Sequence, residues 1–206
     1  MRITLLLLSL MFALAFTAHA QGKRWTETPD ETIWRERYGN CDHGYFVDLP
    51  PGVIGHASHP PSTDHGILIS TKNPGVATEV TLEEPRLVDV YDSIDAEELG
   101  SPGAYIEKYE LKPKNTSARI TILERRDTKF RGSRAVYIHY RKTMGNSTSE
   151  IEELVVYRVP KFLGPSFYVV MLRTTPEFYA RDHVLYLQIR DGLTFVRIPR
   201  GECSNN

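Results

Sequence analysis

The fold is decided by residues 134–174, which read RAVYIHYRKTMGNSTSEIEELVVYRV, then PKFLGP, then SFYVVMLRT. This stretch is the part of the chain densest in β-branched and aromatic residues, which is typical of strands. Turn-forming residues interrupt it at Gly145-Asn146-Ser147 and at Gly164-Pro165. The pattern predicts three consecutive antiparallel strands. Because residues 167–172 are apolar without a break, the third strand should be covered on both faces and lie in the middle of the sheet.

Further strands are predicted on both sides of this stretch. Residues 44–49 alternate and stop at Pro50-Pro51-Gly52, and residues 67–70 form a short apolar run. Residues 118–125 alternate between apolar and polar side chains, which predicts a strand with one solvated face. A short strand over residues 193–198 should end the fold.

Two helices have recognisable start signals. Ser101 precedes Pro102, so a helix should begin there with a serine cap and a proline in its first turn. Thr175-Pro176-Glu177 predicts the start of a second helix, which should end at Gly192. Strands mixed with these helices indicate an α+β fold.

Residues 1–20 have the features of a secretory signal peptide. Arg2 precedes an apolar run over residues 5–16, and Ala18-His19-Ala20 supplies small residues for cleavage near Ala20. The run is shorter than the roughly 20 apolar residues of a spanning helix, and no later segment reaches that length. We therefore expect a secreted or periplasmic protein without a membrane span, whose mature chain begins at Gln21.

The mature chain is long enough for one domain. We expect residues 21–40 to form an N-terminal arm, with a short helix near Thr28-Pro29, and residues 41–203 to form a single α+β domain. The whole sequence has 25 Lys and Arg residues against 26 Asp and Glu residues, a formal net charge of −1. This balance gives no general attraction for nucleic acid, so we expect none as a partner.

The chain has two cysteines, Cys41 and Cys203, one near each end of the expected domain. In an oxidising compartment such a pair is expected to form a disulfide bond. Two independent thiols are the alternative. The spacing does not match that of a zinc knuckle or a redox dithiol.

Histidines gather in residues 53–66, which the sequence predicts to be a long loop. His56, His59, Asp64 and His65 lie within ten positions of one another. Neutral imidazole and carboxylate are ligands for zinc or copper, and the two prolines of this segment would lower the cost of ordering it. A solvated polar loop is the other interpretation, because a loop does not fix the spacing of histidines as a helix does.

Other charged groups have structural explanations at least as good as functional ones. A basic run could dock an anionic partner, but basic residues beside a sheet turn also keep an edge soluble; its members are Arg125, Arg126, Lys129, Arg131 and Arg134. Glu152 and Glu153 are adjacent, so on a strand they should point to opposite faces and cannot share a substrate. His139 and His183 are interpreted as half-buried structural imidazoles.

The order of the elements resembles that of the Mog1/PsbP-like superfamily, which includes the periplasmic DcrB-like proteins. The corresponding segments are Gly44–Gly52, Gly132-Ser133-Arg134-Ala135, Tyr168–Arg173 and Asp182–Phe195. The resemblance covers roughly residues 41–198. It implies an antiparallel β-sheet with helices on both faces, an α/β/α sandwich, used mainly for binding or assembly. It assigns no catalytic residue, because the superfamily shares no catalytic motif.

The sequence thus predicts a secreted or periplasmic, non-enzymatic binding or assembly module, whose partner is an unknown protein or small molecule. It contains no Gly-x-Ser-x-Gly motif and no Gly-rich phosphate loop, which makes an enzyme the weaker class. The alternative is a metal-binding protein or a metal-dependent enzyme that uses His56, His59 and His65 with zinc or copper.

Overall fold

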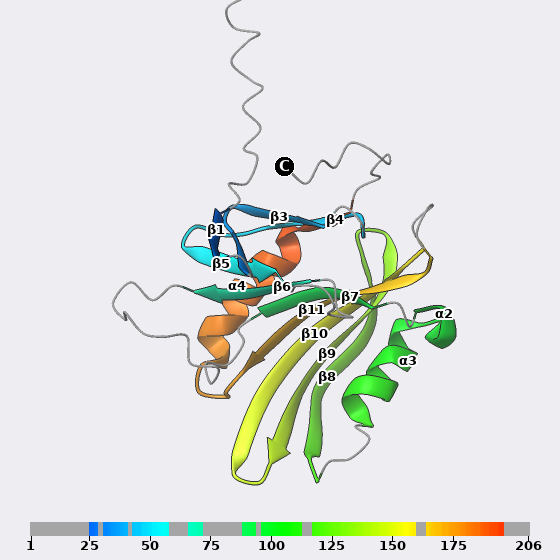
Figure 1. The fold of residues 1–206 in the computed structure, drawn as a ribbon. Helices are drawn as coiled ribbons and strands as arrows, with labels where there is room; N and C mark the ends of the chain where they lie inside the picture. Colours follow the sequence, from blue (N-terminus) through cyan, green and yellow to red (C-terminus); the bar gives the residue numbers. More distant parts are fainter. Residues whose placement is uncertain are drawn as a thin grey trace, which may run out of the picture.

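The computed structural model contains two antiparallel sheets and a small number of helices (Figure 1). It describes residues 25–28, 31–40, 43–57, 66–71, 88–93, 96–112, 117–159 and 164–195. Within these residues, no helix combines the length and the apolar composition needed to cross a bilayer.

The larger sheet has nine strands, and the three strands predicted from residues 134–174 lie side by side within it. In spatial order the sheet contains β1 (Trp25–Thr28), β2 (Glu31–Trp34), β5 (Val53–Ala57), β6 (Ile67–Thr71), β7 (Val88–Ser93), β11 (Ser166–Thr174), β10 (Ser147–Arg158), β9 (Ser133–Met144) and β8 (Arg119–Phe130). Every neighbouring pair is antiparallel. Strand β11 lies between β7 and β10 and is buried on both faces over Ser166–Leu172, as its apolar sequence predicts.

The smaller sheet has three strands, β12 (Leu193–Phe195), β4 (Tyr45–Asp48) and β3 (Arg37–Asn40), in that spatial order. It brings the last described strand of the chain beside the first part of the fold, with Leu193 paired to Val47 and Phe195 to Tyr45. The alternation of β4 places Tyr45 and Val47 in the core and leaves Phe46 and Asp48 partly exposed.

Four helical segments accompany the sheets. They are α2 (Ala96–Leu99), α3 (Pro102–Ile106), the π-helix η1 (Glu107–Leu111) and α4 (Tyr179–Gly192). The predicted serine cap of α3 is confirmed, because Ser101 Oγ accepts a hydrogen bond of 3.2 Å from the Ala104 backbone N–H. Segment η1 continues α3 directly and leads into the connection to β8.

The central strands separate two hydrophobic cores. On one face, Tyr137, Leu154 and Tyr168 pack with Tyr186 and Ile189 of α4. On the other face, the alternate residues of the same strands pack with Tyr105 and Ile106 of α3; they include Val136, Ile138, Val155, Phe167 and Val169. Figure 1 shows α4 on one side of the long strands and α2 and α3 on the other. Burial of these apolar side chains is the main force that holds the layers together.

The structure corrects three expectations from the sequence. Residues 25–28, 31–34 and 37–40 form strands, so the helix expected near Thr28-Pro29 is wrong. Residues 53–57 are strand β5 and pair with β2 and β6, whereas the whole of 53–66 was expected to be a loop. Strand β8 is largely exposed on both faces, whereas one solvated face was expected, because α3 and α4 pack mainly on β9, β10 and β11. The expected short last strand is present as β12, and it pairs with β4 of the smaller sheet.

Candidate functional site

Two glutamates of strand β10 are buried beneath helix α4. Glu150 and Glu152 are two residues apart, so their side chains leave the strand on the same face. Their exposed fractions are only 3% and 1%. A buried carboxylate is strongly unfavourable unless hydrogen-bond donors replace the water that it has lost. The donors around these two glutamates therefore define the site.

Strand β9 supplies both donors to Glu150. His139 Nε2 lies 2.8 Å from Glu150 Oε1, and Arg141 Nε donates to Glu150 Oε2 over 2.9 Å. The sheet register explains this arrangement, because Glu150 pairs with Arg141 and Glu152 pairs with His139 across the two strands. Each carboxylate oxygen of Glu150 thus has its own nitrogen partner.

Helix α4 and strand β9 together hold Glu152. His183 Nδ1 lies 2.6 Å from Glu152 Oε2, and the Tyr179 hydroxyl donates to the same oxygen over 3.1 Å. The Tyr137 hydroxyl of β9 lies within the electrostatic influence of Glu152. Burial and the adjacent negative charge of Glu152 raise the pKa of the Tyr137 and Tyr179 hydroxyls, so both phenols keep their protons and remain donors.

Aromatic rings connect the two acid groups. The His139 and Tyr179 rings are stacked, with centroids 4.6 Å apart and an interplanar angle of 11°. The Tyr179 and His183 ring centroids are 5.3 Å apart, and Tyr186 lies beneath His183 at 6.2 Å. The two imidazoles are therefore on either side of Tyr179, and each contacts a different carboxylate.

A third buried acid extends the network to the start of α4. Thr174 Oγ1 donates to Asp182 Oδ2 over 2.6 Å, and Arg181 Nε donates to Asp182 Oδ1 over 2.7 Å. Asp182 is 4% exposed. Thr174 pairs with Glu150 across β10 and β11, so this third acid adjoins the other two.

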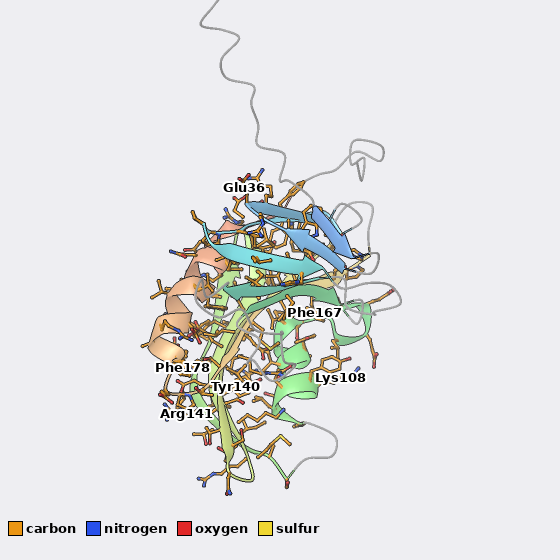
Figure 2. The ribbon with its side chains drawn as sticks, turned by 60° about the vertical axis from the view of Figure 1, so that its left-hand side comes forward. Glu36, Lys108, Tyr140, Arg141, Phe167 and Phe178 are labelled. Atoms are coloured by element: carbon orange, nitrogen blue, oxygen red, sulfur yellow. The ribbon has the colours of Figure 1, made fainter. Side chains whose placement is uncertain are left out.

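The network reaches solvent along one edge, which we call the α4 ledge: Arg141 of β9, Phe178 immediately before α4, and Arg181 and His183 of α4. The side chains of Arg141, Arg181 and His183 are 47%, 67% and 32% exposed, and Phe178 is also exposed. Figure 2 shows Arg141 and Phe178 at the same end of the molecule. The buried side of this edge is acidic, and its exposed side carries guanidinium and imidazole groups.

The guanidinium groups of the α4 ledge are only partly used. Arg141 and Arg181 both contact their buried carboxylates through Nε. In the described part of the chain, no hydrogen bond is formed by the terminal Nη nitrogens of either arginine. A guanidinium fixed at Nε can present its Nη groups to a carboxylate or phosphate with little loss of conformational entropy.

The residues predicted to bind metal are largely beyond what the structure describes. His56 lies in β5, where it pairs with Ile33 of β2 and Leu68 of β6. His59, Asp64 and His65 lie outside the described residues, as do Cys41 and Cys203. Within the described ranges, no group of three or more His, Cys, Asp or Glu residues could hold a metal ion. The metal site and the disulfide bond stay predictions.

The predicted basic run is used mainly within the molecule. Arg125 pairs with Glu107 of η1, Arg126 lies over the Tyr137 ring, Arg131 donates to the backbone at the end of α4, and Arg134 lies over the Tyr157 ring. These contacts fit the interpretation that the run supports the sheet and its turn. The other prediction for charged residues is confirmed, since Glu152 contacts α4 and Glu153 contacts the opposite face.

Sequence reasoning identified His139 and His183 as half-buried imidazoles, which is correct, but it missed that one acid network includes both. His183 and Glu152 are 31 positions apart, so no local pattern links them. One signal was available. Glu150 and Glu152 are spaced for a single face of a strand that the sequence predicts to be buried, and two buried carboxylates require partners from neighbouring elements.

Comparisons with known proteins identify the fold. No protein-family model matches the chain, and no curated protein matches it. The chain is similar to the solution structure of cyanobacterial PsbP (CyanoP) from Synechocystis sp. PCC 6803, with a TM-score of 0.52 and 13% identity over 85% of this chain and 98% of that one.

Two more distant structures are also similar. One is PA94 from Pseudomonas aeruginosa, a protein of unknown function described as a putative regulator (TM-score 0.42, 16% identity, 86% and 98% coverage). The other is LpqN, involved in cell envelope biogenesis of Mycobacterium tuberculosis (TM-score 0.40, 9% identity, 86% and 91% coverage). At 13% identity the similarity to CyanoP concerns the fold alone, and it confirms the resemblance predicted from the sequence: the chain has a PsbP-like α+β fold.

Proposed function

We propose that the protein is an exported, non-enzymatic binding module of the α/β/α sandwich type, and that the α4 ledge holds an acidic segment of a protein partner. This proposal rests on the contacts and exposure of Arg141 and Arg181. Each arginine is anchored through Nε by a buried carboxylate and has its Nη groups available at the surface. The predicted signal peptide at residues 1–20 supports the assignment to an exported protein.

The state of the buried acids favours binding over catalysis. Glu150 and Glu152 each accept hydrogen bonds from two side chains. A general base needs an oxygen within reach of a substrate proton, whereas these oxygens face fixed donors beneath the surface. Their role in this proposal is to orient the arginines and imidazoles above them.

The chemistry of the α4 ledge suits an acidic peptide. Arg141 and Arg181 can each contact a carboxylate in a bidentate manner. His183 hydrogen-bonds to Glu152 through Nδ1 and retains Nε2 for a further hydrogen bond. Phe178 adds an exposed aromatic ring beside Arg181, whose guanidinium lies 4.5 Å from the ring centroid. Aromatic and arginine side chains are the residue types that most often dominate protein interfaces.

Peptide binding by charge-matched variants tests the proposal. The probe is a fluorescent oligo-glutamate peptide, and its affinity is measured for the wild type and for Arg141→Gln, Arg181→Gln and Arg119→Gln. Arg119 is an exposed arginine of β8 and serves as the control, since its loss changes the net charge equally. We expect a loss of affinity of about tenfold for each ledge variant, which corresponds to one charge-assisted contact, and little change for Arg119→Gln.

An equal loss in all three variants would show that the peptide responds only to net charge. Absence of binding to the wild type at low ionic strength would also count against the α4 ledge as an acidic-peptide site. Binding must weaken as salt is added, because exposed charge pairs are screened.

A further inference from the structure

A second pair of acid groups, the partly buried Glu110 and the fully buried Glu153, lies on the face opposite to the α4 ledge. The Tyr140 hydroxyl of β9 is 2.5 Å from Glu110 Oε2 of η1 and 2.9 Å from Glu153 Oε1 of β10. Tyr140 and Glu153 are completely buried, with exposed fractions of 0%. Figure 2 shows Tyr140 in the lower part of the sheet. The Tyr140 hydroxyl therefore lies between two carboxyl groups, one on the π-helix and one on the central sheet.

The arrangement of one phenol and two carboxyl groups suits an extra proton on one of the carboxyl groups. A phenol has one hydrogen to donate, so it can satisfy only one of the two carboxylates fully. If the other group is a carboxylic acid, it donates to the Tyr140 oxygen, and both contacts become complete hydrogen bonds. With both groups ionised, two negative charges would share a single hydrogen.

The surroundings of Glu153 favour the protonated form. Its second oxygen, Oε2, is buried and has no hydrogen-bond partner in the described part of the chain. Arg173 of β11 is the nearby cation, but it is exposed. An ionised Glu153 would therefore have one oxygen without a donor in an apolar layer, which is strongly unfavourable.

We propose that Glu110, Tyr140 and Glu153 form a proton-binding site, and that its proton holds the π-helix η1 against the sheet. The site joins the sheet to a five-residue π-helix, a rare conformation that occurs often at functional sites. Loss of the proton places two negative charges beside Tyr140 and separates η1 from β9 and β10. This inference concerns the face opposite to the α4 ledge and does not depend on the proposed function.

The other charged groups of η1 are paired elsewhere. Glu107 contacts Arg125 of β8, and Lys108 lies 3.6 Å from Glu98 of α2. Both contacts are at the exposed side of the helix, where ion pairs contribute little to stability. The three-group site is therefore the polar contact through which η1 reaches the fully buried Glu153 of the sheet.

The sign of the pH dependence follows from the burial of Glu153. Burial raises the pKa of Glu153, and the negative charge of Glu110 raises it further, whereas the hydrogen bond from Tyr140 and the charge of Arg173 lower it less. A raised pKa means that the closed state binds the proton more tightly than the open state. The stabilisation is complete below the ordinary carboxyl pKa of 4.5 and is lost as pH rises to the pKa of the closed state.

Hydrogen exchange of the η1 amides measures the separation of η1 from the sheet. In the wild type, the protection factors of residues 108–111, corrected for the intrinsic pH dependence of exchange, should fall by up to about tenfold per pH unit within this window. Glu153→Gln keeps an N–H donor for Tyr140 but cannot titrate, so its protection should be independent of pH. Glu107→Gln is the control in the same helix and should retain the wild-type slope, because Arg125 lowers the pKa of Glu107 and keeps it ionised throughout.

A wild-type protection factor that does not change with pH would overturn the proposal, as would a Glu153→Gln variant with the wild-type slope. If Glu153→Gln does not fold, the side-chain carboxyl carbons of Glu110 and Glu153 can be titrated by NMR in the wild type. The proposal requires one of them to ionise well above the ordinary carboxyl value. Ionisation of both near the ordinary value would refute it.

Discussion

Arg131 shows how a single side chain can favour an otherwise unfavourable backbone conformation. Strands β8 and β9 are joined by a two-residue turn in which Arg131 and Gly132 have φ angles of 47° and 81°. Two positive φ values are typical of the tight turns that match the twist of antiparallel strands, and glycine or asparagine usually occupies both positions. At the first of these positions, Arg131 stabilises the turn because its guanidinium donates to the carbonyl oxygens of Asp191 and Leu193, each over 2.6 Å.

These two hydrogen bonds cap the C-terminal end of α4. The carbonyl groups there lack helical partners and carry partial negative charge, so a guanidinium is a favourable partner. We predict that Arg131→Ala lowers the free energy of unfolding by about 1–2 kcal/mol, measured by urea denaturation. Arg131→Gly should cost less, because glycine adopts a positive φ without strain.

Arg119→Ala is the matched control, since Arg119 is an exposed arginine within β8, and the stability of this variant should be close to that of the wild type. Equal stability of Arg131→Ala and the wild type would show that the cap contributes nothing. The sequence indicated a soluble turn at Arg131, but not this role, because the partners lie 60 and 62 positions further along the chain.

Helix α4 approaches the smaller sheet closely at Gly192. The sequence predicts that this glycine ends the helix, and the helix does end there. Its φ is not among the positive values, so it is not required for a left-handed cap. A Cβ atom at this position would lie 2.7 Å from the Asp48 carbonyl oxygen and 3.2 Å from the Asp48 backbone nitrogen. The glycine is therefore needed for close packing of α4 on β4.

We predict that Gly192→Ala lowers the free energy of unfolding by about 1–3 kcal/mol, because backbone must move to accept the methyl group. Gly103→Ala in α3 is the matched control, since the nearest atom to its Cβ is the end of the Arg125 side chain at 3.7 Å. This control should stabilise the protein by about 0.5–1 kcal/mol through helix propensity. Denaturation of both variants measures the contrast, and a stabilised Gly192→Ala would contradict the close approach.

At the scale of elements, the sequence predicts best where its pattern reports burial. Strand β11 and helix α3 were identified correctly from an unbroken apolar run and from a serine and proline start signal. Strand β5 was missed, because Gly55 and His56 interrupt its apolar pattern. The structure shows why Gly55 is there: a Cβ atom would lie 2.1 Å from Ile67 Cδ1, so the side chain of Ile67 occupies the space that a larger residue would need.

At the scale of the whole molecule, buried carboxylates lie on both faces of strand β10. Glu150 and Glu152 serve the α4 face, and Glu153 serves the face covered by η1. Composition gave no indication of this, because a net charge of −1 does not show which charges are buried. The fold class could be predicted from periodicity, whereas the candidate site depends on contacts between residues far apart in the sequence.

The histidine-rich segment offers a separate prediction for the whole protein. Its first member, His56, lies in a paired strand, so a metal site would require the segment after β5 to fold back on it. Zinc is titrated by calorimetry at about pH 7.5, above the ordinary imidazole pKa of about 6.5. We expect no heat of binding. Micromolar binding that is abolished by combining His56→Ala with His59→Ala would instead establish the metal-binding alternative.

Crosslinking tests most directly whether the α4 ledge is a surface for a protein partner. A photoreactive amino acid is introduced at Phe178 in the full chain, expressed in its native host, and crosslinked products are identified after irradiation. Position 159 is the control, because Val159 is also an exposed apolar residue and follows β10 at the opposite end of the β10–β11 pair. We predict a discrete adduct at position 178, none at position 159, and loss of the adduct when Arg141→Gln and Arg181→Gln are combined. An adduct at neither position, or one at position 178 that survives this double substitution, would contradict it.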